Sequence, residues 1–298
     1  MIDIIIGKVG IYMSKMTRRG FFKRIFTIVF TALLTTGAGY FYARYIEPKQ
    51  MNLLKHTVKH PSIPKSFSGI KIAQFSDTHV GHHFGQAELE KVVRLINEEE
   101  PDIVFFTGDL MDNPLEYDGS YNLINILKQI KAPLGKFAIY GNHDHGGYGT
   151  ETYEEIMESS DFTVLKNENT TIELIDKSQI FIAGVDDLML GRPDFNETLR
   201  DIPEDAYTIL LAHEGDAADS IAEQFHVNLQ LSGHSHGGQV QIPFLGPLIT
   251  PPLGSKFYEG FYQLDDLTLY VNKGLGTTRE PYRFLAPPEI TFFTLERQ

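Results

Sequence analysis

The stretch Ile70–Gly81, IKIAQFSDTHVG, joins an apolar segment of strand length to two side chains that bind divalent cations. Asp77 and His79 stand two residues apart, directly after the strand predicted over 70–76. Because side chains alternate between the two faces of a strand, this spacing points both to one side. Few roles other than metal binding need a carboxylate and an imidazole there. We therefore expect further ligands elsewhere in the chain.

The composition restricts the kinds of site that are possible. The chain has 298 residues, of which 42% are hydrophobic and 22% are charged, and this predicts a packed globular core. It contains no cysteine, which excludes disulfides, thiolate zinc sites and cysteine nucleophiles. A metal must therefore be held by His, Asp, Glu or Asn, and there are eleven histidines.

Residues 1–44 have the character of a leader, followed by a domain over 45–298. Basic residues precede the uncharged run 25–43, namely Lys15, Arg18, Arg19, Lys23 and Arg24. The run of 19 residues is long enough to span a bilayer. The Arg18-Arg19 pair, with Phe21, Phe22 and Lys23 after it, resembles a twin-arginine signal, which implies the twin-arginine export machinery as a partner. The alternative is an ordinary membrane helix with flanking positive charge, and both readings place the domain outside the cytoplasmic membrane or in the cell wall.

The predicted domain is strongly acidic. The leader holds seven of the 26 basic residues and one of the 39 acidic residues, so the remainder carries 19 basic and 38 acidic residues, a net charge of −19. Nonspecific binding of nucleic acid normally rests on a basic surface. This charge therefore argues against a nucleic-acid partner.

Apolar segments of strand length alternate with helical patterns after residue 66. Strands are predicted over 70–76, 103–106, 136–140, 180–184, 208–212 and 227–231, and helices over 86–99, 121–130 and 217–225. From about residue 257 the pattern is strand-rich without helices, and we expect it to supply a second sheet. The alternation predicts an α/β fold with buried sheets.

Polar side chains follow five of these strands. They are Asp77 and His79; Asp109 and Asp112; Asn142, His143 and Asp144; His213; and His234 with His236. Each group alone is typical of a turn or polar loop. Open α/β sheets, however, place ligands beyond the carboxyl ends of their strands. The five groups together therefore predict one shared site.

The number and type of side chains indicate two metal ions. Seven are candidate ligands: Asp77, His79, Asp109, Asn142, His213, His234 and His236. Seven are too many for one four-coordinate zinc and suit two ions that share a carboxylate. Mixed oxygen and imidazole ligands favour Mn, Zn or Fe over Ca or Mg. Two such ions can hold a bridging hydroxide that attacks phosphorus in line, which predicts a phosphoric ester hydrolase.

The ordered motifs D-x-H, G-D-x-x-D, G-N-H-D, a lone His and G-H-x-H resemble those of calcineurin-like metallophosphoesterases over about residues 67–240. The resemblance implies a four-layer α/β/β/α sandwich of two mixed sheets. It implies one metal at Asp77, His79, Asp109 and His236, and a second at Asp109, Asn142, His213 and His234. It also implies that His143 is the general acid, that Asp112 orients it, and that Asp144 supports the ligands. "NKGLGTT" and "YRFLAPPEI" are similar to the exported or membrane-associated YkuE and YaeI type of this family.

Other positions and functions are left with alternatives. Arg283 either meets a substrate phosphate or makes a surface salt bridge, and Asp186, Asp187 and His145 are expected in turns and exposed loops. The apolar segment 242–255 forms either a rim of the cleft or a rigid crossover loop. A catalytically silent metal-binding scaffold and a nuclease are the alternative functions. Asn142, His143 and Asp112 favour an enzyme, whose phosphate ester stays open between phospholipids, wall polymers, nucleotides and simple diesters.

Overall fold

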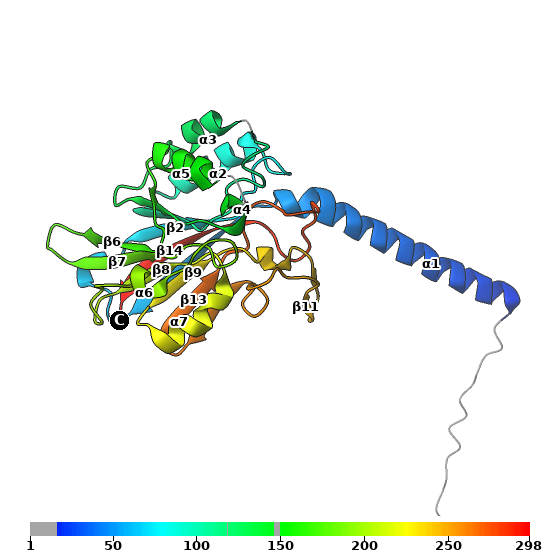
Figure 1. Cartoon of the computed structure of the whole chain (residues 1–298). Helices are drawn as coiled ribbons and strands as arrows, with labels where there is room; N and C mark the ends of the chain where they lie inside the picture. Colours follow the sequence, from blue (N-terminus) through cyan, green and yellow to red (C-terminus); the bar gives the residue numbers. More distant parts are fainter. Residues whose placement is uncertain (1–16, 118, 146–149) are drawn as a thin grey trace, which may run out of the picture. The chain divides into compact units, whose positions relative to one another are not determined.

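The computed structural model describes residues 17–117, 119–145 and 150–298, and the chain divides between Tyr42 and Ala43 into two units (Figure 1). In its described part, the first unit is helix α1 (Arg18–Phe41), which Thr17 caps by accepting a hydrogen bond from the amide of Gly20. The helix that begins at Arg18 is long and apolar enough to cross a membrane. The division lies two residues before the expected boundary.

The second unit contains two six-stranded sheets. The first has the order β1-β14-β2-β3-β4-β5, and its strands are β1 (Asn52–His60), β2 (Lys71–Phe75), β3 (Ile103–Phe106), β4 (Lys136–Ala138), β5 (Thr163–Val164) and β14 (Glu289–Arg297). The second has the order β12-β13-β9-β8-β7-β6, and its strands are β6 (Glu168–Glu173), β7 (Gln179–Gly184), β8 (Thr208–Leu211), β9 (Leu229–Ser232), β12 (Gly260–Leu264) and β13 (Leu267–Val271). Both sheets are mixed, since β14 is antiparallel to β2, and β12 and β6 are antiparallel to their neighbours.

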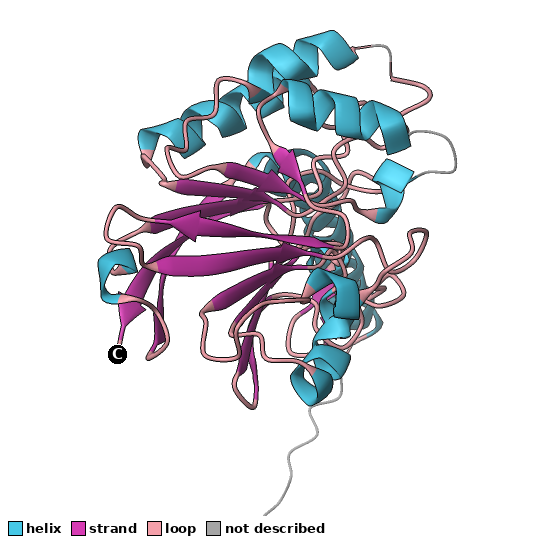
Figure 2. Cartoon of the chain, turned by 60° about the vertical axis from the view of Figure 1, so that its left-hand side comes forward, coloured by secondary structure: helices cyan, strands magenta, loops and turns pink. Residues whose placement is uncertain are grey.

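Alternating apolar side chains create the layers. On β3, Ile103 and Phe105 join the core between the sheets, whereas Val104 and Phe106 join the core beneath helices. The helices on the first sheet are α2 (Gln86–Glu98), α3 (Ser120–Leu127) and α5 (Thr150–Ser159). Those on the second are α6 (Phe195–Thr198) and α7 (Ala218–Gln224). Figure 2 shows helices on both outer faces of the stacked strands, which confirms the four-layer α/β/β/α sandwich.

The strands after residue 257 do not all enter the second sheet, contrary to expectation. β12 and β13 do, but β14 lies in the first sheet between β1 and β2. β1 was not predicted, because its side chains are mostly exposed and lack a continuous apolar pattern. It pairs with β14 in parallel, from Asn52 opposite Glu289 to His60 opposite Arg297.

The two sheets are tied together where the site begins. The side chain of Gln74 on β2 donates to the hydroxyl of Thr107 at 3.1 Å and to the carbonyl of Ser232 on β9 at 3.0 Å. Gln74 is fully buried, so these bonds satisfy a group that would be costly unpaired. They hold the carboxyl ends of β2, β3 and β9 beside one another.

Candidate metal centre

The loops that carry the predicted ligands turn sharply after their strands. Five of the seven residues have positive φ: Asp77 (52°), His79 (44°), Asp109 (60°), His234 (67°) and His236 (52°). Such backbone conformations cost about 1–3 kcal/mol each and persist only where the surrounding structure enforces them. Loop-to-loop bonds do so, since the Asp77 amide donates to the Gly108 carbonyl at 2.9 Å and the His79 amide to the Asp109 carbonyl at 3.2 Å.

Two glycines allow the loops to approach this closely. Gly108 has φ of +96°, and a Cβ there would lie 2.6 Å from Nδ1 of His213. A Cβ on Gly233 would collide with Oδ2 of Asp77. A larger residue at either position would therefore push a predicted ligand aside.

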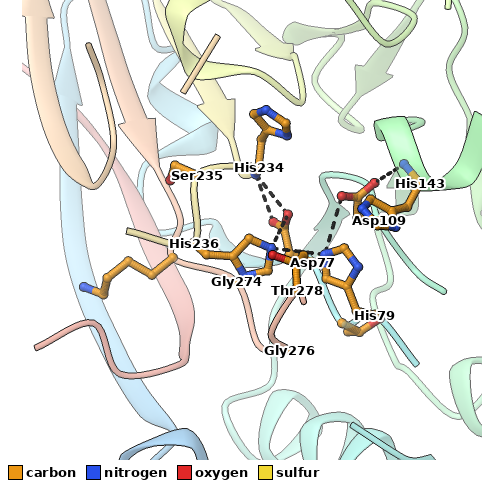
Figure 3. A network of polar contacts seen from close by, with 12 residues as sticks. Asp77, His79, Asp109, His143, His234, Ser235, His236, Gly274, Gly276 and Thr278 are labelled. Atoms are coloured by element: carbon orange, nitrogen blue, oxygen red, sulfur yellow. Dashed lines mark hydrogen bonds and ion pairs between the residues drawn. The ribbon is translucent and has the colours of Figure 1, made fainter. Parts of the chain in front are cut away.

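The ligands form two clusters, Asp77–His79–His236 and Asp109–His213–His234, and a third group of His79, Asp109 and His143 links them. Figure 3 shows Asp77, His79, Asp109, His143, His234 and His236 of these groups. In the first, Nε2 of His79 and Nε2 of His236 are 3.1 Å apart, and the latter is 3.5 Å from Oδ1 of Asp77. In the second, which also contains His234, Nε2 of His213 is 3.3 Å from Oδ2 of Asp109. The same Oδ2 is 3.5 Å from Nε2 of His79, so Asp109 lies between the two clusters.

Some buried atoms of the predicted ligands make no hydrogen bond within the described part of the chain, and this fits the binding of divalent cations. Among the described residues, Oδ1 of Asn142 and Nε2 of His213 are buried without a hydrogen-bond partner. The outer nitrogens are held: Nδ1 of His213 is 2.6 Å from the Thr107 carbonyl, and Nε2 of His234 is 2.8 Å from the Pro252 carbonyl. These bonds fix each ring with its other nitrogen free to ligate. The donor set therefore suits a metal site, as predicted.

Comparison with known proteins decides the family. A model of the Metallophos family, described as calcineurin-like phosphoesterase, matches residues 70–238. The chain belongs to the calcineurin-like metallophosphoesterase family. It is 51% identical over 284 residues to YkuE of Bacillus subtilis (strain 168), named an uncharacterised metallophosphoesterase, with 95% of this chain and 99% of that protein covered.

More distant matches extend across other organisms. The chain is 32% identical over 247 residues to a Danio rerio transmembrane protein with a metallophosphoesterase domain, and the match covers 79% of this chain but 55% of that protein. Among solved structures, a 5′-nucleotidase precursor from Thermus thermophilus has a TM-score of 0.45 and 12% identity, with 69% of this chain and 49% of that chain covered.

Asp109 and His213 form a charged pair when the protein holds no metal. Burial opposes both charges, but the neighbouring His213 holds the pKa of Asp109 well below its ordinary value. Burial likewise disfavours a charged His213, yet Asp109 and Asp77 hold the pKa of His213 well above its usual value. Burial, with the charge of His213 beside it, lowers the pKa of His234 to about 4. A ligand imidazole must be neutral, so metal binding at His213 requires loss of a proton.

His143 lies beside Asp109 and contacts Asp112, the residue expected to orient it. Its amide donates to Oδ1 of Asp109 at 2.8 Å, and its Nδ1 is 2.7 Å from the main-chain carbonyl of Asp112. The Asp112 carboxylate is farther, at 3.7 Å from that nitrogen, and 3.5 Å from Nδ1 of His79. The backbone of Asp112, rather than its carboxylate, therefore makes the direct bond. Burial lowers the pKa of His143, but Asp109 and Asp112 outweigh it and raise the pKa overall.

Arg283 is placed where it cannot make either expected contact. The side chain is fully buried, so it makes no surface salt bridge. Its guanidinium donates to the carbonyls of Lys273, Gly274, Gly276 and Ala286, at 2.5–3.1 Å. Its Nη2 is also 3.3 Å from Nδ1 of His236. These bonds consume the groups that would bind a phosphate, so Arg283 shapes the loop behind a ligand instead.

Two supporting contacts were only partly predictable. Asp144 is buried, and its carboxylate accepts from the amides of Asp109, Leu110 and Gly141 at 2.7–2.9 Å, which agrees with its expected support of the ligands. His145, expected in an exposed loop, is 10% exposed in its side chain, and its Nε2 is 2.6 Å from Oδ1 of Asp186. Asp186 therefore ties the end of β7 to the short helix α4 (Asn142–His145), which carries His143. His145 and Asp186 are 41 positions apart, so no local sequence pattern indicated that they would pair.

Proposed function

We propose that this protein is a dinuclear metal-dependent phosphoesterase that hydrolyses a phosphomonoester or phosphodiester outside the cytoplasmic membrane. The observation that carries the proposal is the pair of Asp and His clusters joined through Asp109, with His143 beside them. A catalytically silent scaffold would have no need to retain a full ligand set and a proton donor. A nuclease is disfavoured by the acidic composition of the domain.

The residues divide between two cation positions. Asp77, His79, Asp109 and His236 would hold one cation, and Asp109, Asn142, His213 and His234 the other. Two bound divalent ions, of the Mn, Zn or Fe type, supply positive charge at phosphorus and make bound water acidic. They also draw an anionic substrate toward a chain whose net charge is −13.

His143 supplies the proton that the leaving group needs. Its Nδ1 is held by the carbonyl of Asp112, so Nε2 is the atom left to donate. Its side chain is 31% exposed, in contrast to the fully buried His79, so a substrate can reach it. Its raised pKa favours the protonated form in which it acts as an acid.

We infer an outer location from the leader. The Arg18-Arg19 pair opens helix α1, and the residues that follow Arg24 in this helix carry no charge. We place the protein at the outer face of the cytoplasmic membrane or in the cell wall, reached through the twin-arginine export machinery. Phospholipids and wall polymers are the phosphate esters present there.

A substrate panel tests the reaction class. Purified full-length protein, with metal content measured, is assayed on phosphomonoesters and phosphodiesters before and after chelation. We expect hydrolysis that disappears with the metals and returns when Mn or Zn is restored. A fully metal-loaded protein that hydrolyses no member of the panel would favour the silent scaffold.

A second experiment tests location. Replacing Arg18 and Arg19 with Lys preserves the charge and removes the paired guanidinium groups. We expect the variant to stay inside the cell, as seen by protease accessibility of the domain in spheroplasts. Normal export of this variant would reduce the leader to a general membrane anchor.

A further inference from the structure

The segment after the last metal ligand exposes a concentrated set of apolar side chains. We call residues 242–249 the apolar hairpin; its strands are β10 (Gln241–Ile242) and β11 (Gly246–Pro247) (Figure 1). Phe244 and Leu245 are 106% and 80% exposed, and Leu248 and Ile249 are 58% and 76% exposed. Exposed apolar patches of this kind mark protein or membrane contacts.

The hairpin also carries no charged side chain, although the chain as a whole has many. Residues 237–255 contain no Asp, Glu, Lys or Arg, although 22% of the chain is charged. An uncharged segment loses no ion hydration when it leaves water. This absence separates the hairpin from the acidic remainder of the domain.

Internal hydrogen bonds satisfy part of the hairpin backbone. The amide of Leu245 donates to the carbonyl of Ile242 at 3.0 Å, and the amide of Leu248 donates to the carbonyl of Val240 at 2.9 Å. Pro243 has no amide hydrogen to satisfy. Main-chain groups without partners are the principal cost of placing an irregular segment in lipid. This turn is therefore suited to shallow insertion into a bilayer.

Hydrogen bonds place the base of the hairpin beside the start of the domain. The amide of Arg283 donates to the carbonyl of Ala43 at 3.0 Å, and Ala43 is the first residue after the unit that contains helix α1. The next residue, Phe284, exchanges backbone bonds with Gln239 and Gln241 at 2.8 Å each. When α1 spans a bilayer, Ala43 lies at the bilayer surface. The hydrogen bond from Arg283 to Ala43, and those of the adjacent Phe284 with Gln239 and Gln241, then connect this point to the base of the hairpin. Because of this connection, the bilayer is the partner that we expect the hairpin to reach.

The same segment reaches the metal centre. The Pro252 carbonyl is 2.8 Å from Nε2 of the ligand His234, and the Ser235 hydroxyl donates to the Tyr258 carbonyl at 2.6 Å. Pro252 is ten positions after Ile242, at the start of the hairpin. A membrane contact made by the hairpin would therefore lie close in the chain to the group that orients a metal ligand.

We propose that the apolar hairpin inserts its tip into the bilayer that holds α1, and that the substrate is a lipid phosphate ester taken from that bilayer. The proposed lipid substrate rests on the proposed phosphoesterase function, whereas the proposed insertion of the hairpin does not. Because the hairpin is uncharged, its insertion should depend little on anionic lipid or salt. A neutral bilayer is therefore a sufficient probe.

The absence of tryptophan from the chain permits a direct test of insertion. Full-length Phe244→Trp protein is reconstituted in phosphatidylcholine vesicles with or without lipids brominated in their acyl chains. Ile175→Trp is the matched control, because Ile175 is also fully exposed, at 103%, in the turn between β6 and β7. We expect bromine to lower the Phe244→Trp emission by about twofold or more, since it quenches only groups at acyl-chain depth. The control should be unaffected.

Two results would overturn insertion. Equal quenching, or none, in both variants would show that the hairpin is not selectively in the bilayer. A blue-shifted emission of Phe244→Trp without bromine quenching would show that another protein surface, including a second copy of the chain, covers the hairpin.

A kinetic experiment tests the proposed lipid substrate. The measurement is the ratio of turnover on phosphatidylglycerol or phosphatidic acid in vesicles to turnover on soluble bis(4-nitrophenyl) phosphate. The double variant Phe244→Ser/Leu245→Ser should lower this ratio by about tenfold or more, because both side chains lose apolar burial. Ile175→Ser should leave the ratio unchanged. An unchanged ratio in the double variant would overturn the role of the hairpin in reaching the lipid. Turnover of the soluble diester without turnover of either lipid by the parent protein would overturn the lipid substrate. Failure of the parent protein to hydrolyse either class would count against the proposed function, while the quenching result would still decide insertion.

Discussion

The strand-end loops of the metal centre bury polar side chains, whereas the apolar hairpin exposes apolar ones. Asp77, His79 and His213 are fully buried, while Phe244 is fully exposed. Folding alone favours neither arrangement, because buried charge and exposed hydrocarbon both cost free energy. Each becomes favourable with a component that is not polypeptide: metal ions for the loops and, as proposed, lipid for the hairpin. Departures from the usual burial pattern therefore locate function in both regions.

The largest expected effect comes from the carboxylate shared by the two clusters. Asp109→Asn removes the negative charge between them, so both ions should be lost and turnover should fall by at least about a thousandfold. Phe244→Ser is the matched change in the other region and should keep both ions. Elemental analysis and kcat for a soluble diester measure this. Two ions with full turnover in Asp109→Asn would remove Asp109 from its assigned position.

The next effect separates proton donation from metal binding in the buried loops. His143→Gln should keep both ions and lose about 10²–10⁴-fold in kcat on alkyl esters, whose alkoxide needs a proton. The loss should be smaller for nitrophenyl esters, because nitrophenolate departs unaided. Asp112→Asn should have little effect, since the Asp112 main chain makes the direct bond to His143.

Equal losses of His143→Gln on both ester types would contradict the general-acid role. Loss of metal from this variant would make His143 a ligand, which its place in a cluster with His79 and Asp109 permits.

A third effect concerns stability behind the metal centre. Arg283→Met leaves several buried carbonyls without a donor and should lower the free energy of unfolding by roughly 3 kcal/mol or more. Lys177→Met, at an exposed position, should change it by less than about 0.5 kcal/mol. Denaturant unfolding of the metal-loaded proteins measures both. Unchanged stability with a raised KM would restore Arg283 as a substrate contact.

The smallest effect is a pH dependence of metal binding. The pKa of His213 is raised in the metal-free protein, so a metal must displace its proton. Affinity for Mn or Zn should then rise by up to about tenfold per pH unit, from near pH 6.5 to the raised pKa. Metal titrations over this range test it, with Phe244→Ser expected to match the parent. Affinity that does not change with pH would contradict the charged pair.

The raised pKa of His213 also determines whether the stability of the metal-free protein rises or falls with pH. Protonated His213 makes its full contribution to stability below the pKa of the unfolded state, about 6.5. This contribution is lost as the pH rises through the pKa of the folded state. The metal-free protein should therefore unfold more easily at higher pH. Stability that increases over this range would contradict the assignment.

Local sequence patterns predicted the strands and helices that build the site. Apolar periodicity predicted α2 and β3 closely, because their buried faces repeat within a few residues. The ligands followed from polar residues at strand ends, and the structure brings the Asp and His members of the set together. Both signals reside in short segments, so one sequence suffices to read them.

Contacts between distant segments could not be read in this way. The loop containing Arg283 folds back on itself, so its guanidinium faces carbonyls rather than solvent. The bond from His143 goes to the backbone of Asp112, a group that every residue possesses. The pairing of β1 with β14 joins mostly exposed residues, for which side-chain patterns specify no partner.

The position of β14 has a consequence for how the protein is made. Its residues, 289–297, complete the first sheet between β1 and β2, and they pair with residues 237 positions earlier in the chain. During synthesis, β1 and β2 therefore each keep an open edge until residues 289–297 have been made. Open edges of this kind are sites of mispairing and aggregation. A chain cut before Glu289 would therefore leave β1 without a neighbouring strand and β2 paired only with β3.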